Sequence, residues 1–150
     1  MNRFLATTFE DIKPDFIIWT GDNNPHDIWN STQYEAFEST IKFTKVLTNY
    51  YNSTIRVYPV IGNHEKYPVD LYNSNDPKSE KKFLKKLGKD WRHWLDEQAY
   101  HSFIHYGFYT MKHLNTNLRI IALNSVTCDT FNFWAIQNPT DPHGQVIIKL

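Results

Sequence analysis

Three short segments of the chain are apolar almost throughout and rich in β-branched or aromatic residues. They cover residues 15–20, 56–61 and 118–124. Runs of this length and composition predict buried strands. Because the apolar residues are nearly continuous, they favour a parallel sheet covered on both faces over an antiparallel sheet with one wet face. Pro59 interrupts the second run and indicates a strand start or a sheet edge there.

Two longer segments carry apolar residues at helical spacing. In residues 34–51 and 79–98, apolar side chains recur every three or four positions, so that each segment has one apolar face. The order strand, helix, strand over residues 15–61 predicts a βαβ unit. The chain is therefore expected to have an α/β fold, with a βαβ-built sheet flanked by helices.

The rest of the chain gives weaker patterns. Residues 67–77 are rich in proline, asparagine and aspartate and predict a loop. Residues 102–111 are interpreted as a further strand, which forms a hairpin through residues 114–117 with the segment at 118–124. Asp141 followed by Pro142 indicates the start of a helix. No repeat or linker divides residues 1–150, which we interpret as one domain.

Composition excludes several classes of protein. Sixteen basic and sixteen acidic residues among 150 give no net charge, which argues against nucleic-acid binding. A single cysteine excludes an internal disulfide and CxxC-type metal or redox sites. The longest apolar runs are too short for a membrane-spanning helix, and residues 1–6 are too short for a secretory signal. Nothing indicates an obligate protein partner.

Two of the predicted strands end in a similar way. The first runs into Gly21-Asp22 and, shortly after, His26; the second runs into Gly62-Asn63-His64-Glu65. Ligands bind beyond the carboxyl ends of parallel strands, and a glycine lets the backbone turn sharply there. Each element alone has an ordinary explanation as turn chemistry. Together, the oxygen donors and imidazoles point to a divalent metal at a hydrolytic centre.

These strings resemble the signature blocks of calcineurin-like metallophosphoesterases. The longer strings narrow the resemblance to the acid sphingomyelinase branch, including acid sphingomyelinase-like phosphodiesterases. They are Trp19-Thr20-Gly21-Asp22-x-x-x-His26-Asp27-x-Trp29, Tyr58-Pro59-x-x-Gly62-Asn63-His64-Glu65, Trp91-x-x-Trp94-Leu95, Gly107-Phe108-Tyr109, Asn132-Phe133-Trp134 and Thr140-Asp141-Pro142-x-Gly144-Gln145. The likeness covers most of the chain.

The resemblance implies a role for each matching position. Asp22 would bridge two zinc ions and Asn63 would ligate the second through its side-chain carbonyl. His26 and His64 would flank the scissile phosphate, one protonating the leaving oxygen and the other stabilising the transition state. The implied reaction is attack of a zinc-activated water on sphingomyelin, giving ceramide and phosphocholine, or on a related phosphodiester such as a nucleotide derivative.

The chain also departs from the family pattern. No Asp-x-His pair precedes Asp22 and no Gly-His dipeptide occurs anywhere, so two expected groups of metal ligands are missing. We therefore expect a partial metallophosphoesterase fold without its first strand and C-terminal half, that is, an internal piece of a longer enzyme. The alternative is a catalytically inactive remnant without a metal pair. The resemblance pairs Cys128 with a cysteine beyond residue 150; otherwise Cys128 is a small buried hydrophobe.

Three secondary signals complete the prediction. The sequons at Asn30 and Asn52 are candidate glycosylation sites and fit the secreted or lysosomal location that the resemblance implies. Six lysines between Lys78 and Lys89 lie on a predicted helix. They form either an ordinary solvated helix face or a surface that contacts a membrane of anionic lipid, which would suit a phospholipid substrate.

Overall fold

A computed structural model describes residues 12–51, 55–73 and 76–137. The strands are β1 (Phe16–Trp19), β2 (Arg56–Pro59), β3 (Tyr109–Lys112) and β4 (Arg119–Ala122). The α-helices are α2 (Gln33–Tyr51), α3 (Pro77–Trp91), α4 (Glu97–Tyr106) and α5 (Phe133–Gln137). Short 3₁₀ helices are η1 (Ile28–Asn30), η2 (Asn63–Glu65) and η3 (Ser125–Cys128). The helix predicted at Asp141 lies outside the described residues.

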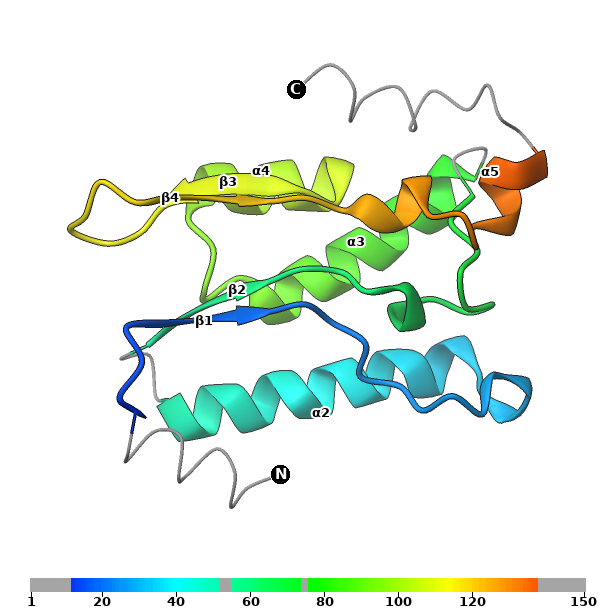
Figure 1. Cartoon of the computed structure of the whole chain (residues 1–150), viewed down its shortest axis with the longest axis horizontal. Helices are drawn as coiled ribbons and strands as arrows, with labels where there is room; N and C mark the ends of the chain where they lie inside the picture. Colours follow the sequence, from blue (N-terminus) through cyan, green and yellow to red (C-terminus); the bar gives the residue numbers. More distant parts are fainter. Residues whose placement is uncertain (1–11, 52–54, 74–75, 138–150) are drawn as a thin grey trace.

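The predicted βαβ unit is confirmed. Strand β1 pairs with β2 in parallel, and α2 connects them along the lower edge of Figure 1. Pro59 is the last residue of β2 and pairs with Trp19, so it ends the strand instead of starting it. Proline has no N–H to donate, and the next amide, that of Val60, donates to the Trp19 carbonyl at 2.7 Å. The two strands therefore end together.

The predicted hairpin at the third strand is also confirmed. Strands β3 and β4 pair antiparallel, with Tyr109 opposite Ala122 and Lys112 opposite Arg119. Residues of β3 alternate between buried and exposed, as expected for a pair with one wet face. This pair forms a sheet separate from β1 and β2, so the third predicted strand does not extend the parallel pair.

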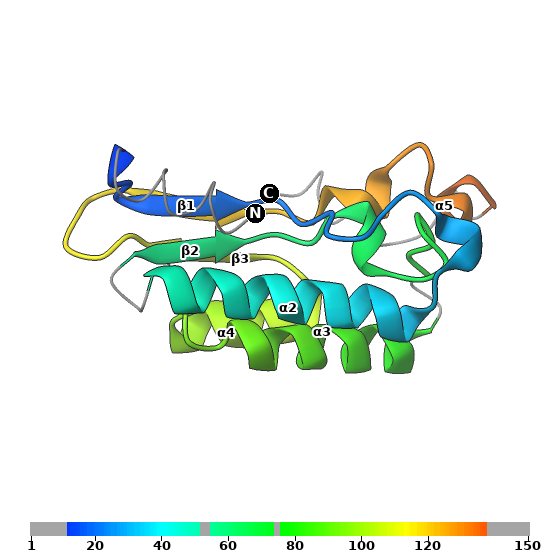
Figure 2. The same ribbon diagram turned by 90° about the horizontal axis from the view of Figure 1, so that it is seen from below.

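The three long helices of the described residues cover one face of the strands. Figure 2 shows α2, α3 and α4 on the same side of the strand layer. On the other side, Ile18 is 61% exposed and Ile121 is 66% exposed. The prediction of a sheet covered on both faces is therefore wrong for the described residues, because their long helices all pack on one side.

Two further predictions on helix boundaries are wrong. Residues 79–98 do not form one helix: α3 ends at Trp91, and α4 starts at Glu97. The first half of the segment at 102–111 belongs to α4, which ends at Tyr106, and a strand begins only at Tyr109. The cause is local capping. The Asp96 carboxylate accepts from the Ala99 amide at 2.7 Å, and the left-handed Gly107 donates its N–H to the Phe103 carbonyl at 2.8 Å.

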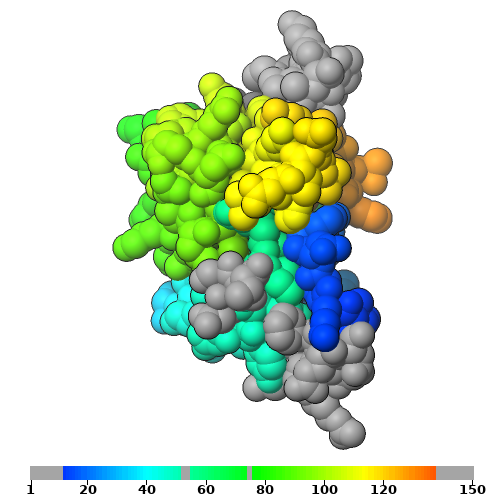
Figure 3. Space-filling model, turned by 90° about the vertical axis from the view of Figure 1, so that its left-hand side faces the viewer, coloured from blue at the N-terminus to red at the C-terminus, as the bar shows by residue number. Residues whose placement is uncertain are grey.

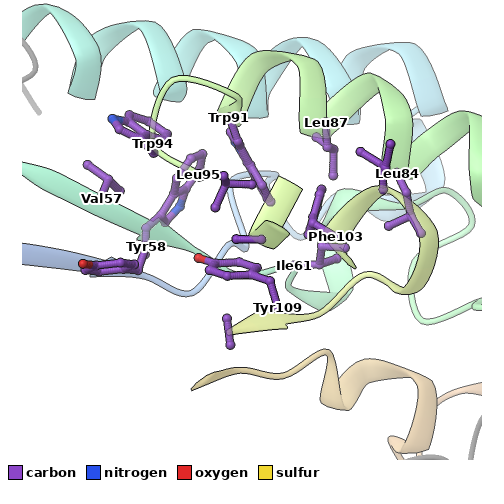
Figure 4. Packing of buried hydrophobic residues seen from close by; sticks show 14 of the residues in the cluster. Val57, Tyr58, Ile61, Leu84, Leu87, Trp91, Trp94, Leu95, Phe103 and Tyr109 are labelled. Carbon is purple, nitrogen blue, oxygen red and sulfur yellow. The ribbon is translucent and has the colours of Figure 1, made fainter. Parts of the chain in front are cut away.

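An aromatic core holds the helices against the strands (Figure 4). Trp91 and Phe103 are fully buried, with ring centroids 5.1 Å apart. The Trp91 indole N–H donates to Thr44 Oγ1 at 3.2 Å and so ties α3 to α2. The Tyr109 hydroxyl donates to the Pro59 carbonyl at 3.0 Å and ties β3 to the end of β2. The core therefore anchors the strand end that leads to η2.

The two ends of the molecule differ in content. At one end, the β3–β4 turn lies beside the start of β1, as the space-filling view shows (Figure 3). Toward the other end, β1 and β2 run into the polar loops that carry the predicted site residues (Figure 1). Among the described residues, no helix has the length and apolar character that spanning a bilayer requires.

Candidate functional site

The loops that follow β1 and β2 are in backbone contact. Gly21 and Asp22 are consecutive left-handed residues, with φ of 78° and 63°, and they turn the chain sharply at the end of β1. A Cβ atom built on Gly21 would lie only 2.4 Å from the Gly62 nitrogen. Glycine is therefore required at residue 21 both by the positive φ and by the close approach of the second loop.

The carboxylate of Glu65 holds this contact together. It is 1% exposed and accepts hydrogen bonds from four nitrogens. The Gly62 and Asp22 amides donate to Oε2 at 2.6 and 3.0 Å, and the Asn23 amide and side chain donate to Oε1 at 3.0 and 2.9 Å. We call Gly21–Asn23 together with Gly62–Glu65 the junction. In the sequence, Glu65 is the last residue of the Gly62-Asn63-His64-Glu65 motif. Its position in the first turn of η2, like the acid of a capping box, indicates the bond to the Gly62 amide but not the bonds to Asp22 and Asn23.

Asp22 and Asn63 both lie at the junction. The exposed Asp22 carboxylate accepts from the His64 amide through Oδ1 at 3.2 Å. The Asn63 side-chain nitrogen donates to Asp70 Oδ1 at 2.9 Å. The structure thus brings together the two strand ends that carry the predicted metal ligands. That they act as ligands stays a prediction.

The two predicted catalytic histidines lie beside each other. The ring centroids of His26 and His64 are 4.6 Å apart, with the rings inclined at 63°. His26 is exposed, whereas His64 is 5% exposed. Within the described residues, His64 Nδ1 is buried without a hydrogen-bond partner. An unsatisfied buried ring nitrogen is costly in a purely structural role.

A set of buried hydrogen bonds that supports the junction was not predicted from the sequence. The buried Tyr72 hydroxyl donates to the Gly62 carbonyl at 2.8 Å. Asn132, 1% exposed, accepts from the Tyr72 amide at 3.2 Å and donates to the Tyr72 carbonyl at 3.3 Å. Burial, together with the nearby carboxylates of Glu65 and Glu80, raises the pKa of Tyr72 well above its ordinary value. Tyr72 therefore stays a neutral donor at any physiological pH.

The donors at the junction fit a divalent cation in kind. A carboxylate and an amide carbonyl are hard oxygen ligands, and imidazoles lie nearby. Among the residues that the structure describes, however, no three His, Cys, Asp or Glu side chains are grouped closely enough to hold a metal ion. Asp22 and Asn63 supply only part of the three or four protein ligands that a zinc site normally has.

An open pocket adjoins Asp22. It has a volume of about 530 Å³ and is lined by Trp19, Gly21, Asp22, Asn23, Ser39, Lys42 and Phe43. Its lining includes two aromatic residues, Trp19 and Phe43, and two charged residues, Asp22 and Lys42. It gives a ligand of moderate size access to the Asp22 carboxylate.

The remaining predicted residues have mixed outcomes. Asn30 is exposed in η1, as a glycosylation site must be, and Asn52 lies outside the described residues. Cys128 is exposed at the end of η3, so the alternative of a buried hydrophobe is wrong. All six lysines between Lys78 and Lys89 are exposed along α3.

Comparisons with known proteins identify a family and several relatives of the chain. Residues 2–146 match the family described as calcineurin-like phosphoesterase. The chain is 35% identical over 143 residues to "Sphingomyelin phosphodiesterase B" of Dictyostelium discoideum, covering 95% of this chain and 22% of that protein. It is 33% identical over 135 residues to "Sphingomyelin phosphodiesterase" of Homo sapiens, covering 88% of this chain and 21% of that protein. With "Cyclic GMP-AMP phosphodiesterase SMPDL3A" of Homo sapiens the identity is 32% over 149 residues, covering 95% and 32%. The chain thus spans about a fifth of the length of the sphingomyelin phosphodiesterases that it matches.

Proposed function

The chain belongs to the calcineurin-like phosphoesterase family, and on that premise we propose that it carries the central part of a metal-dependent phosphodiesterase active site. The observation that supports this proposal is the junction itself. An exposed carboxylate, an amide side chain and two imidazoles lie at two strand ends that one buried carboxylate fastens together. Such convergence at the carboxyl ends of parallel strands is the usual place for a ligand site.

In this proposal, Asp22 and Asn63 bind a pair of zinc ions. Bound cations would neutralise a phosphodiester and lower the pKa of an attacking water. Asp22 has its carboxylate on the solvent side and one oxygen fixed by the His64 amide, so it is oriented before a cation arrives. The remaining metal ligands come from outside the described residues, and full activity needs them.

His26 and His64 act on the phosphate and on the leaving group. One imidazole protonates the departing alkoxide, while the other stabilises negative charge on the phosphate oxygens. The two rings lie close enough to contact one phosphate group together. His64 is held by its backbone, since its amide donates to Asp22 and its carbonyl accepts from the Asn24 side chain at 2.6 Å.

The substrate that we propose is sphingomyelin or a related phosphodiester, including nucleotide derivatives. The support is the names of the relatives, which include both sphingomyelin phosphodiesterases and a cyclic GMP-AMP phosphodiesterase. The proposal extends to a secreted or lysosomal location, for which the exposed sequon at Asn30 gives support, and to a disulfide from the exposed Cys128.

A second candidate is a remnant of the fold that binds no metal. The absence of a three-ligand group among the described residues favours it. Zinc binding by the purified chain, measured by equilibrium dialysis, separates the two candidates. Binding that Asp22→Ala and Asn63→Ala weaken, and that Asp15→Asn just before β1 does not, supports the metal site. Equal zinc uptake by all variants, or none, supports the remnant.

We also propose that the lysines of α3 bind a membrane of anionic lipid. Lys78, Lys81, Lys82, Lys85, Lys86 and Lys89 are all exposed on one helix, and basic clusters of this kind bind anionic lipid surfaces. Sedimentation with phosphatidylcholine vesicles containing increasing phosphatidylserine tests this proposal. Binding should rise with phosphatidylserine and be lost when Lys81, Lys82, Lys85 and Lys86 are all changed to Glu. Equal binding of that variant would contradict the proposal.

A further inference from the structure

We propose that Asp70 is a positioning residue that fixes the orientation of the Asn63 amide, so that its carbonyl oxygen faces the metal site. This inference rests on the proposed function. It concerns a residue outside the strand-end motifs, to which neither the sequence nor the resemblance had given a role.

The first step is the hydrogen bond between the two side chains. Asn63 Nδ2 donates to Asp70 Oδ1 at 2.9 Å. A carboxylate can only accept, so the Asn63 nitrogen must point toward Asp70. The Asn63 carbonyl oxygen then points away from Asp70 and is free to bind a cation. A metal cannot bind the NH₂ group, and a flipped amide would present the wrong atom.

The second step is that Asp70 is itself held in place. Its backbone is left-handed, with φ of 61°, a conformation that Asp tolerates better than most residues. The Asp70 amide reaches back to the Asn63 carbonyl at 3.5 Å, and the Leu71 amide donates to the Pro68 carbonyl at 3.2 Å. The loop thus folds Asp70 back onto Asn63.

The third step is the anchoring of this loop at its two ends. It begins at Gly62 and ends at Tyr72, and the Tyr72 hydroxyl donates to the Gly62 carbonyl at 2.8 Å. Asn132 accepts from the Tyr72 amide and donates to its carbonyl. Because Tyr72 and Asn132 are both buried, the loop that carries Asp70 is closed and well fixed. A fixed partner of a ligand preorganises the site.

The decisive experiment exchanges the two side chains. In Asp70→Asn, the new amide can either accept from Asn63 Nδ2 or donate to Asn63 Oδ1, so it no longer commits the Asn63 amide to the orientation that leaves its oxygen for the cation. The double variant Asn63→Asp with Asp70→Asn keeps the net charge, restores a donor–acceptor pair and leaves an oxygen on the metal side. Asp15→Asn is the control for loss of one negative charge.

Two readouts separate this proposal from the proposed function. In the metal-free protein, nuclear magnetic resonance of the Asn63 side-chain amide should show slow hydrogen exchange, and the exchange should become fast in Asp70→Ala. In a zinc titration, Asp70→Asn should bind about tenfold more weakly, and the double variant should regain most of the affinity, while Asp15→Asn should bind like the wild type.

Each outcome bears on one of the two proposals. Equal zinc affinity of Asp70→Asn and wild type would overturn the role of Asp70 and leave the metal site standing. If the double variant bound zinc as weakly as Asp70→Asn, the proposal would also be overturned, because a disturbed loop conformation, and not the orientation of the Asn63 amide, would then explain the lower affinity. If the wild type takes up no zinc, the proposed metal site is wrong. Rapid hydrogen exchange of the Asn63 side-chain amide in the metal-free wild type would overturn the role of Asp70, whatever the zinc titration shows.

Discussion

The two strand pairs of this molecule are of similar size but are stabilised differently. The antiparallel pair of β3 and β4 is an amphipathic hairpin whose buried residues pack on α4 and the aromatic core. The parallel pair of β1 and β2 packs on the same core, but its ends are fastened by a network of directional hydrogen bonds to Glu65. Apolar packing tolerates adjustment, whereas a buried network fails when one member is lost. The junction is thus the more specified and more fragile region.

The largest effect should come from Glu65→Ala. The variant leaves the buried amide of Gly62 and the partly buried amides of Asp22 and Asn23 without their acceptor, which should cost about 3–5 kcal/mol of unfolding free energy. Urea denaturation measures the loss. Glu38→Ala removes a partly exposed glutamate from α2 and serves as the control.

Hydrogen exchange locates this effect. The amides of Asp22 and Asn23 should exchange much faster in Glu65→Gln, which keeps the shape of the side chain, while amides of β3 and β4 should keep their protection. If Glu65→Ala were no more destabilising than Glu38→Ala, the junction would be held by packing, as the hairpin is.

Two glycines allow the same substitution at the junction and in the helical layer. A Cβ on Gly62 would lie 2.3 Å from Asp22 Oδ1 and 2.7 Å from the Asp22 nitrogen, so Gly62→Ala should cost about 3 kcal/mol and displace the Asp22 carboxylate. A Cβ on Gly88 in α3 would lie 2.5 Å from the Ile104 Cγ2 methyl group. Gly88→Ala should cost less, about 2 kcal/mol, because alanine favours the helix, although the buried Ile104 carries this methyl group on its Cβ atom and must change χ1 or shift with α4. Urea midpoints of the two variants check the order, and a larger loss for Gly88→Ala would reverse the comparison.

Two buried tyrosine hydroxyls give a smaller and pH-dependent comparison. Tyr72 donates to the Gly62 carbonyl at the junction, and Tyr109 donates to the Pro59 carbonyl in the core. Each change to phenylalanine should cost about 1–2 kcal/mol at neutral pH. Only Tyr72→Phe should shift the amide resonances of Gly62 and Asn63, because only Tyr72 contacts the junction.

The sign of the pH dependence follows from burial. Burial raises the pKa of both tyrosines above the ordinary value of 10.0, so the folded state favours the neutral phenols. Their contribution to stability is complete below that ordinary pKa and is lost as the pH rises above it, where the unfolded chain releases the protons. Each phenylalanine variant should therefore lose less stability than the wild type between neutral and alkaline pH. Parallel alkaline losses in wild type and variants would contradict this assignment.

The comparison also explains what the sequence could predict. The strand ends at Gly21-Asp22 and Gly62-Asn63 could be located because a buried apolar run followed by glycine and polar residues is a local pattern. The contacts of Glu65, Asp70, Tyr72 and Asn132 could not, because they join residues that are far apart in the chain or lie in an irregular loop. Local sequence patterns therefore predict the location of the site better than they predict the long-range hydrogen bonds that stabilise it.

The fold errors have a similar cause. The segment around Phe103 reads as a strand from its aromatic content, yet the caps at Asp96 and Gly107 make it helical. Those caps are visible in the sequence, so this helix boundary could have been predicted. The exposure of Ile18 could not have been predicted, because only the arrangement of the helices determines which face of a sheet is covered.

The smallest predicted effect is electrostatic and lies far from the junction. Asp90 is an acid in the last turn of α3, where the helix dipole disfavours negative charge, and burial raises the pKa of its carboxyl. A raised carboxyl pKa means that its contribution to stability is present below the unfolded value of 3.8 and lost as the pH rises through the folded value. Asp90→Asn should therefore stabilise the protein by about 0.5 kcal/mol at neutral pH and have no effect in strong acid.

The other end of α3 supplies the matched control. Asp76 caps the helix, and its carboxylate accepts from the Ser79 amide at 3.1 Å, so Asp76→Asn should instead lower stability by about 0.5 kcal/mol. Urea denaturation of both variants at neutral and acid pH tests the opposite signs. Changes of the same sign would mean that net charge, and not position along α3, sets the effect. If the α3 variants change the unfolding free energy by tenths of a kcal/mol and Glu65→Ala lowers it by several kcal/mol, then surface charge on α3 has a small effect on stability and the buried carboxylate of the junction has a large one.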